Sequence, residues 1–259
     1  MFEFIVIVES SADARTATKL AERVILEKVD WLELEYLSGI FCWSGLEEGT
    51  GCSCWKDIKD IVERAKESGI RLPKVIGHHG DSPLKADGAA ARKVINLVRY
   101  LQKHRKIRAV LLIRDLDNQP ERKAGLEQAA AGKSNGKSED APKLTIVIGT
   151  AERNREAWVL NGFMPQNPEE EQILAEIKAQ LNFDPCLESH RLRSQSFAES
   201  DRMRNPKVVL EKLTGGEMGR ERQCWEDTGL EILRERGIHT GLTDYICEVE
   251  EKLIPIMTE

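Results

Sequence analysis

The chain has 259 residues, of which 41% are hydrophobic and 32% are charged, and its formal net charge at pH 7 is −6. This length allows a substantial hydrophobic core, in one large domain or in a domain with an appendage. The negative charge argues against a protein that holds nucleic acid by bulk electrostatic attraction alone, and the lack of a long apolar run argues against a membrane-spanning protein.

The first residues and the cysteines predict a cytoplasmic protein. The opening MFEFIVIVES carries a glutamate near its start and lacks the basic flank and cleavage site of a signal peptide, so we interpret it as the first strand of the fold. Six cysteines are too few for a disulfide scaffold in a chain of this length, as expected in a reducing compartment.

The first half of the chain alternates predicted strands with predicted helices. Strands are expected at 4–8, 31–37, 74–77, 109–114 and 144–148, and helices at about 14–25, 58–65, 90–101 and 120–131. A Gly-rich loop is expected at 39–54, and a polar, mobile loop at 132–142. Strands that are separated by helices imply right-handed crossovers, so we predict an α/β fold with a mainly parallel sheet flanked by helices.

The second half of the chain carries helical patterns only. Helices are expected at about 154–161, 168–181, 206–213, 225–236 and 242–255. We therefore predict that residues 1–161 form the α/β domain and that residues 162–259 form a helical C-terminal extension packed on the sheet.

Acidic residues follow three of the predicted strands: Glu9 and Asp13, Asp115 and Asp117, and Glu152 and Glu156. Because positions i and i+2 of a strand face the same side, Asp115 and Asp117 are expected to project together. The carboxyl ends of parallel strands form the ligand-binding edge of an open sheet, so all six carboxylates are expected near that edge. Helix capping explains Asp13 and Glu156 but not the Asp115 and Asp117 pair. A divalent metal ion would offset the repulsion between these carboxylates.

The order of these residues resembles the Toprim domain of type II topoisomerases, primases, small nucleases and the OLD (overcoming lysogenization defect) nucleases. The OLD pattern combines Glu-x-x-x-Asp, Asp-x-Asp, a hydroxyl residue two positions before a Glu, and a later Lys. The matching residues here are Glu9, Asp13, Asp115, Asp117, Thr150, Glu152 and Lys207. Glu-Ala-Trp at 156–158 and Asn-Pro-Lys at 205–207 also resemble small standalone Toprim-like bacterial proteins, which are often encoded beside ATPases in phage-defence loci.

This resemblance covers residues 1–160 and the region of Lys207. It departs from the family at Ser10, where glycine is usual, and at Thr150, where serine is commoner. It implies a divalent-metal-dependent nuclease, with DNA favoured over RNA as the substrate but RNA left open, and with a partner ATPase; a homo-oligomer is a further option. Because the chain has no P-loop pattern, any control driven by ATP is expected to come from another chain.

A nuclease of this kind needs two Mg²⁺ or Mn²⁺ ions bound by hard oxygen ligands. We assign Glu9, Asp115 and Asp117 to one ion, and Asp13 and Glu152 to the second. Thr150 is expected to position a ligand or a water molecule, and Lys207 to offset negative charge in the transition state. Glu156 is held in reserve as an alternative ligand.

Other functions fit the sequence less well. The main alternative is a non-catalytic Toprim-like module that regulates an ATPase, and the complete set of carboxylates argues against it. A topoisomerase would need a tyrosine in a DNA-gate domain, and a primase would need further domains. A glycosyltransferase with an Asp-x-Asp motif would leave Glu9, Asp13 and Glu152 without a role.

Two other groups of residues have alternative interpretations. Cys42, Cys52 and Cys54, with His78 and His79, suggest zinc, but the spacing C-x9-C-x-C is not a standard zinc pattern and free cysteines are the default. The two histidines could instead contact substrate. Basic segments at 103–106, 190–193 and 202–204 are either solvated surface or contacts for phosphate groups.

Overall fold

The protein is described by a computed structural model, in which residues 1–75, 77–79, 82–132, 142–196, 198 and 201–258 are placed. Within this part of the chain, one sheet has the strand order β2-β1-β6-β7, and β3 also pairs with β1. Its strands are β1 (Phe2–Val8), β2 (Phe41–Ser44), β3 (Ser53–Cys54), β6 (Ile107–Asp115) and β7 (Thr145–Ala151). All of these pairings are parallel. The predicted α/β fold with a mainly parallel sheet is therefore confirmed.

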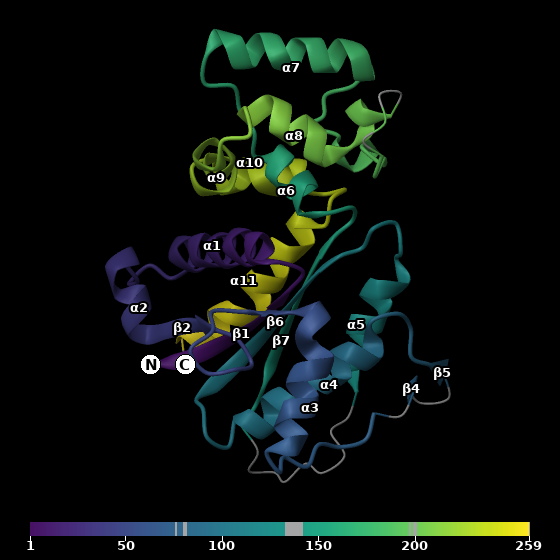
Figure 1. Cartoon of the computed structure of the whole chain (residues 1–259). Coiled ribbons are helices and arrows are strands. Elements are labelled where there is room, and N and C mark those ends of the chain that lie inside the picture. The colour runs from purple at the N-terminus through teal and green to yellow at the C-terminus, as the bar shows by residue number, and fades with distance from the viewer. Residues whose placement is uncertain (76, 80–81, 133–141, 197, 199–200, 259) are drawn as a thin grey trace.

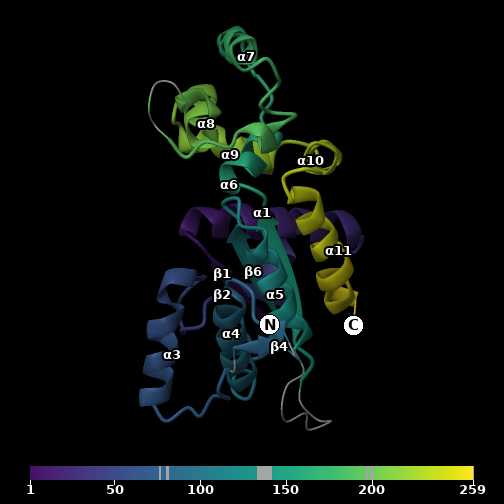
Figure 2. The same cartoon turned by 90° about the vertical axis from the view of Figure 1, so that its right-hand side faces the viewer.

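Helices cover both faces of this sheet (Figures 1 and 2). The helices α1 (Ser11–Lys28) and α11 (Leu242–Thr258) lie on one face, and α3 (Ile58–Glu67), α4 (Gly88–Leu101) and α5 (Glu121–Ala131) lie on the other. In strand β1 the sequence is apolar at positions 4–8 because both faces are buried: Phe4 and Val6 belong to the first core cluster, whereas Ile5 and Ile7 belong to the second. Both faces of a central parallel strand need apolar side chains.

The C-terminal half forms a group of helices beyond the carboxyl ends of the strands (Figure 1). They are α6 (Arg155–Asn161), α7 (Pro168–Leu181), α8 (Pro206–Thr214), α9 (Met218–Glu226) and α10 (Leu230–Arg236). Helix α11 then runs back along the sheet, where the buried Tyr245 hydroxyl donates a hydrogen bond of 2.8 Å to the carbonyl of Ala17. One hydrophobic cluster thus contains residues from both predicted parts of the chain.

Three of the expected secondary-structure elements differ from the structure of the described residues: the strands at 31–37 and 74–77 and the single helix at 225–236. At 31–37 the chain forms the short 3₁₀ helix Leu34–Tyr36 and the start of α2 (Leu37–Ile40), because Trp31 and Leu34 are about 60% exposed and do not alternate into the core. The strands β2 and β3 lie instead inside the expected Gly-rich loop, where the ring of Phe41 packs 4.8 Å from that of Phe4.

The expected strand at 74–77 is absent from its described residues, and its position 76 lies outside them. The neighbouring residues form a small antiparallel pair of β4 (His78–His79) and β5 (Ser82–Pro83). The single helix expected at 225–236 is divided into α9 and α10, since the hydroxyl of Thr228 donates to the carbonyl of Gly162 between them. Most of the expected mobile loop at 132–142 lies outside the described residues.

The backbone of Gly125 in α5 lies close against the backbone at the start of α4. A Cβ atom at this position would lie 1.9 Å from the carbonyl oxygen of Ala86. We expect Gly125→Ala to lower the free energy of unfolding by about 2 kcal/mol, because the backbones must separate. The matched control is Gly219→Ala in α9, where a Cβ would meet nothing within 4 Å and helix propensity should raise stability by up to about 1 kcal/mol. Urea unfolding measures both, and equal effects would contradict the close approach.

None of the helices in the described residues is long and apolar enough to cross a membrane.

Candidate functional site

A cavity of about 390 Å³ lies where β1 and β6 end, next to the start of α6 and the segment that precedes α8. Five carboxylates line it: Glu9, Asp13, Asp115, Asp117 and Glu156. The predicted Lys207 also lines this cavity. The structure therefore brings together five of the seven predicted site residues and the acidic residue that was held in reserve.

Local backbone structure places these side chains at the edge of the sheet. Glu9 directly follows β1, Asp13 lies in the first turn of α1, and Asp115 is the last residue of β6. Asp117 is not in the strand, contrary to the expected i and i+2 arrangement. It lies in a turn with φ of 48°, followed by Asn118 at 64°, a left-handed conformation that Asp and Asn adopt more readily than most residues. This turn, rather than strand alternation, brings Asp117 to the cavity that Asp115 lines.

The loop after β6 is fixed by hydrogen bonds to the loop after β7. The N–H groups of Leu116 and Asp117 donate to the carbonyls of Ala151 and Arg153, at 2.8 and 3.1 Å. The indole N–H of Trp55 donates to the carbonyl of Ile113 at 2.7 Å, two residues before Asp115. The carboxylates are thus held by a rigid sheet edge.

The carboxylates at this edge repel one another. Burial, as the largest cause, and the charges of four acidic neighbours, in the order Asp13, Glu156, Glu9 and Asp117, together raise the pKa of Asp115 to about 8. Burial also raises the pKa of Glu9 above its usual value, although the guanidinium groups of Arg114 and Arg122 act in the opposite direction. Groups with strongly shifted pKa values that share a cavity are typical of functional sites.

Two buried oxygen atoms of the cavity residues have no hydrogen-bond partner among the described residues: Glu9 Oε1 and Asn154 Oδ1. Glu9 Oε1 lies 2.5 Å from Arg114 Nη1, a contact with the distance of an ion pair but without hydrogen-bond geometry. Asp13 Oδ2, in contrast, accepts a hydrogen bond of 2.6 Å from the Ser10 hydroxyl. Unsatisfied buried oxygen atoms are costly unless a cation or a water molecule binds them.

These donors suit a hard divalent cation, because Mg²⁺ and Mn²⁺ prefer carboxylate and amide oxygens. In the described residues, however, no group of three or more His, Cys, Asp or Glu side chains is arranged so that it could hold a metal ion. Three of the carboxylates are paired with arginines: Glu9 with Arg114, Asp117 with Arg122 and, at 4.0 Å, Glu156 with Arg155. Binding of an ion therefore requires side-chain rotation at Glu9 and Asp117.

Lys207 is placed by the first turn of α8. Its N–H donates a hydrogen bond of 3.0 Å to the side-chain oxygen of Asn205, the residue that caps this helix. Asn205 is buried, whereas Lys207 is exposed. The Asn-Pro-Lys segment thus fixes the backbone of the lysine at the rim of the acidic cavity and leaves its ammonium group accessible.

Thr150 and Glu152 are not brought to this cavity. Thr150 is buried and lines a separate cavity between α5 and α11. Glu152 is exposed, and its charge is one of those that raise the pKa of Lys123, which lines that second cavity. Glu156, in the first turn of α6, is the acidic residue after β7 that lines the candidate site.

Several residues of the site carried no recognisable sequence signal. Arg114 and Arg122 pair with its carboxylates, and Asp87 pairs with both arginines. Asn154 and Gln195 also line the cavity, and the amide of Gln195 donates a weak hydrogen bond of 3.4 Å to Asp117. The one hint of these arginines in the sequence was Arg114, a basic residue directly before Asp-x-Asp.

The alternative groups of residues lie elsewhere. Cys42, Cys52 and Cys54 are free thiols, and burial raises the pKa of each, which disfavours the thiolate that binds zinc. His78 is exposed in β4 and is not among the residues that line the acidic cavity.

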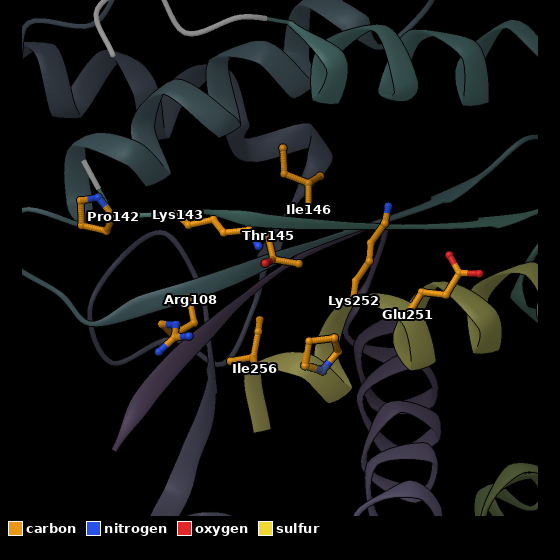
Figure 3. A pocket seen from close by; sticks show the side chains of 9 residues that line it. Arg108, Pro142, Lys143, Thr145, Ile146, Glu251, Lys252 and Ile256 are labelled. Carbon is orange, nitrogen blue, oxygen red and sulfur yellow. The ribbon is translucent and has the colours of Figure 1, made fainter. Parts of the chain in front are cut away.

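A larger cavity, of about 520 Å³, lies at the other end of the sheet, near the first residues of β6 and β7 (Figure 3). It is bounded by Arg108 of β6, by Lys143 and Ile146, and by Lys252 and Ile256 of α11. Its Lys252 is paired with Glu248 at 2.5 Å. We place the candidate chemistry at the smaller, acidic cavity, because five carboxylates converge there and the pKa values of two of them, Asp115 and Glu9, are raised.

In comparisons with protein-family models, with curated proteins and with solved structures, the chain matched none of them. Its function is therefore argued from the chemistry of the site.

The raised pKa of Asp115 predicts how pH changes stability. The pKa of an unfolded aspartate is about 3.9, so unfolding releases a proton between that value and the folded value of about 8. The free energy of unfolding of the metal-free protein should therefore fall as pH rises through this window. Asp115→Asn removes the effect, and we expect it to raise stability by about 2 kcal/mol at pH 8 and by much less at pH 5. Urea unfolding at both pH values measures this, and a variant less stable than the wild type at pH 8 would contradict it.

Proposed function

We propose that the chain is a divalent-metal-dependent nuclease that hydrolyses phosphodiester bonds at the acidic cavity. The observation that carries the proposal is the convergence of five carboxylates, from the ends of β1 and β6, the turn after β6 and the first turns of α1 and α6, on one cavity in which the pKa of Asp115 is raised to about 8. A bound cation would offset the repulsion between these carboxylates. The resemblance to the Toprim domain supports this assignment and favours DNA over RNA as the substrate.

The proposed roles follow from position in the cavity. Glu9, Asp115 and Asp117 hold one ion, and Asp13 serves the second. Glu156 takes the place that was expected for Glu152, because Glu156 lines the cavity and Glu152 does not. When bound, Mg²⁺ or Mn²⁺ would supply an activated water and neutralise the phosphoryl oxygens.

Lys207 is proposed to stabilise the negative charge that develops on the phosphoryl group. It lines the same cavity as the carboxylates and is exposed, so that its ammonium group can reach a bound backbone. The segment before α8 also contributes Ser194 and Gln195 to the cavity, directly after the basic segment at 190–193. The basic segment at 190–193, together with Ser194 and Gln195, is the proposed path by which a nucleic-acid backbone reaches the carboxylates. The resemblance further suggests a partner ATPase and a role in defence against phage.

A non-catalytic module that regulates an ATPase is the second candidate. The observation that favours it is the pairing of Glu9 with Arg114, of Asp117 with Arg122 and of Glu156 with Arg155, which offsets the charge of three of the five carboxylates without a metal ion. In such a module the acidic residues and the arginines would serve to hold the sheet edge together.

Incubation with nucleic acids separates the two candidates. Purified protein is mixed with supercoiled plasmid, linear DNA or RNA, in Mn²⁺, in Mg²⁺ or in EDTA. We expect nicked or linear plasmid in the presence of metal and none in EDTA. A protein that is inert on all three substrates with both metals, and that still binds an ATPase encoded beside it, would support the module and contradict the nuclease.

A further inference from the structure

Four ion pairs connect two of the cavity carboxylates through an aspartate outside the cavity. Arg114 lies between Glu9, at 2.5 Å from its Nη1, and Asp87, whose carboxylate accepts a hydrogen bond of 2.7 Å from its Nε. Arg122 likewise lies between Asp117, at 3.1 Å, and Asp87, at 3.6 Å. The order of the network is therefore Glu9, Arg114, Asp87, Arg122 and Asp117.

The position of Asp87 is fixed by the backbone. It caps α4 in a left-handed conformation with φ of 61°. The residue before it, Ala86, lies against Gly125 of α5, where there is no room for a side chain. Asp87 itself does not line the acidic cavity, and its side chain is 20% exposed. It is a rigidly held negative charge behind the two arginines.

The arginines are held as firmly as the aspartate. The side chains of Arg114 and Arg122 are 13% and 16% exposed, and the guanidinium of Arg114 lies over the ring of Trp55. Arg122 also donates a hydrogen bond of 2.7 Å to the backbone carbonyl of Asp115. A guanidinium does not lose its proton in a protein, so these two positive charges persist whether or not a metal ion is bound.

Two persistent cations beside a metal site compete with the metal. Each guanidinium pairs with a carboxylate that the ion needs, and each also has Asp87 as an alternative partner. When an ion attracts Glu9 and Asp117 and repels the arginines, Asp87 can keep both guanidinium groups paired where they stand. Without Asp87, the arginines would have the cavity carboxylates as their main partners.

We propose that Asp87 is a positioning residue for the metal site, which holds Arg114 and Arg122 beside the cavity so that Glu9 and Asp117 can turn toward the ion. This inference rests on the proposed function, because it assigns a metal ion to the acidic cavity. It extends that function to a residue of another element, α4, and it explains why carboxylates suited to a metal ion are paired with arginines in its absence.

Mn²⁺ binding without nucleic acid tests the proposal, by titration calorimetry or by the electron paramagnetic resonance signal of free Mn²⁺. We expect Asp87→Asn to raise the Kd for Mn²⁺ about tenfold, the range typical of residues that orient metal ligands. Arg122→Gln should lower the Kd, since it frees Asp117. The matched control is Asp244→Asn, which removes the same charge from a surface ion pair with Lys123 and should change the Kd less than about twofold.

A combination of variants separates this local effect from the general effect of charge. In a protein with Arg114→Gln and Arg122→Gln, Asp87→Asn should change the Kd less than about twofold, because its partners are gone. If that protein does not fold, Arg122→Gln alone is the background, and the effect of Asp87→Asn should be reduced there. A full tenfold effect in either background would overturn the proposal.

The test also distinguishes this inference from the proposed function. A wild-type protein that binds no Mn²⁺ would overturn both. A wild-type protein that binds Mn²⁺ and cleaves nucleic acid, together with an Asp87→Asn variant of unchanged affinity, would overturn the role of Asp87 alone.

Discussion

Replacing Asp115 with asparagine should lower metal-dependent cleavage by about a thousandfold or more, the loss expected when a central metal ligand is removed. The charges of all four other carboxylates of the cavity raise the pKa of Asp115, so its own charge interacts with each of theirs. Asparagine has the same shape but lacks the negative charge that binds the ion. Plasmid nicking rates in Mn²⁺ measure the change.

The stability of the same variant makes this result interpretable. Because Asp115→Asn should stabilise the metal-free protein at pH 8, a loss of cleavage cannot be attributed to unfolding. Asp244→Asn, at the surface pair with Lys123, serves as the control and should retain full activity. If Asp115→Asn cleaves at a rate close to that of the wild type, the acidic cavity is not the catalytic site.

Glu156 and Glu152 give the second large effect, as a matched pair. Both are glutamates after β7, but Glu156 lines the acidic cavity, whereas Glu152 is exposed outside it. We expect Glu156→Gln to lower cleavage by about a hundredfold or more and Glu152→Gln to leave it within about twofold. Cleavage rates at several Mn²⁺ concentrations measure both variants.

The reverse outcome would be equally clear. An inactive Glu152→Gln variant beside an active Glu156→Gln variant would mean that the OLD pattern, in which the ligand lies two residues after Thr150, assigns the ligands correctly. The arrangement of side chains after β7 would then have to change when a metal ion binds.

The strands that form the centre of the sheet could be predicted from the sequence, because their signal is strong. Both β1 and β6 contain a continuous apolar run, at 4–8 and 109–113, as burial on two faces requires. Strand β2 was missed because it has only four residues and lies among glycines, while the exposed Trp31 and Leu34 before it imitate a strand. Short edge strands depend on tertiary pairing, here with Phe2 to Ile5, more than on local pattern.

The candidate site could be predicted to the extent that it depends on strand ends. Glu9 and Asp115 share a cavity because β1 and β6 are parallel neighbours, so their carboxyl ends meet. Thr150 and Glu152 were assigned to the site from the OLD pattern and the expected end of the strand at 144–148. Thr150 instead lies within β7, and which side Glu152 faces after the strand depends on the path of the next loop. The arginine network was not predictable, since Asp87 comes from α4, which no motif connects with the strand ends.

The central claim is that the carboxylates of this cavity bind divalent metal ions, and crystals soaked in Mn²⁺ test it most directly through anomalous diffraction. We predict an anomalous peak within bonding distance of the carboxylates of Asp115 and Glu9, with the Glu9 carboxylate turned away from Arg114. A cavity without a peak at millimolar Mn²⁺, in which Glu9 is still paired with Arg114, would contradict the claim.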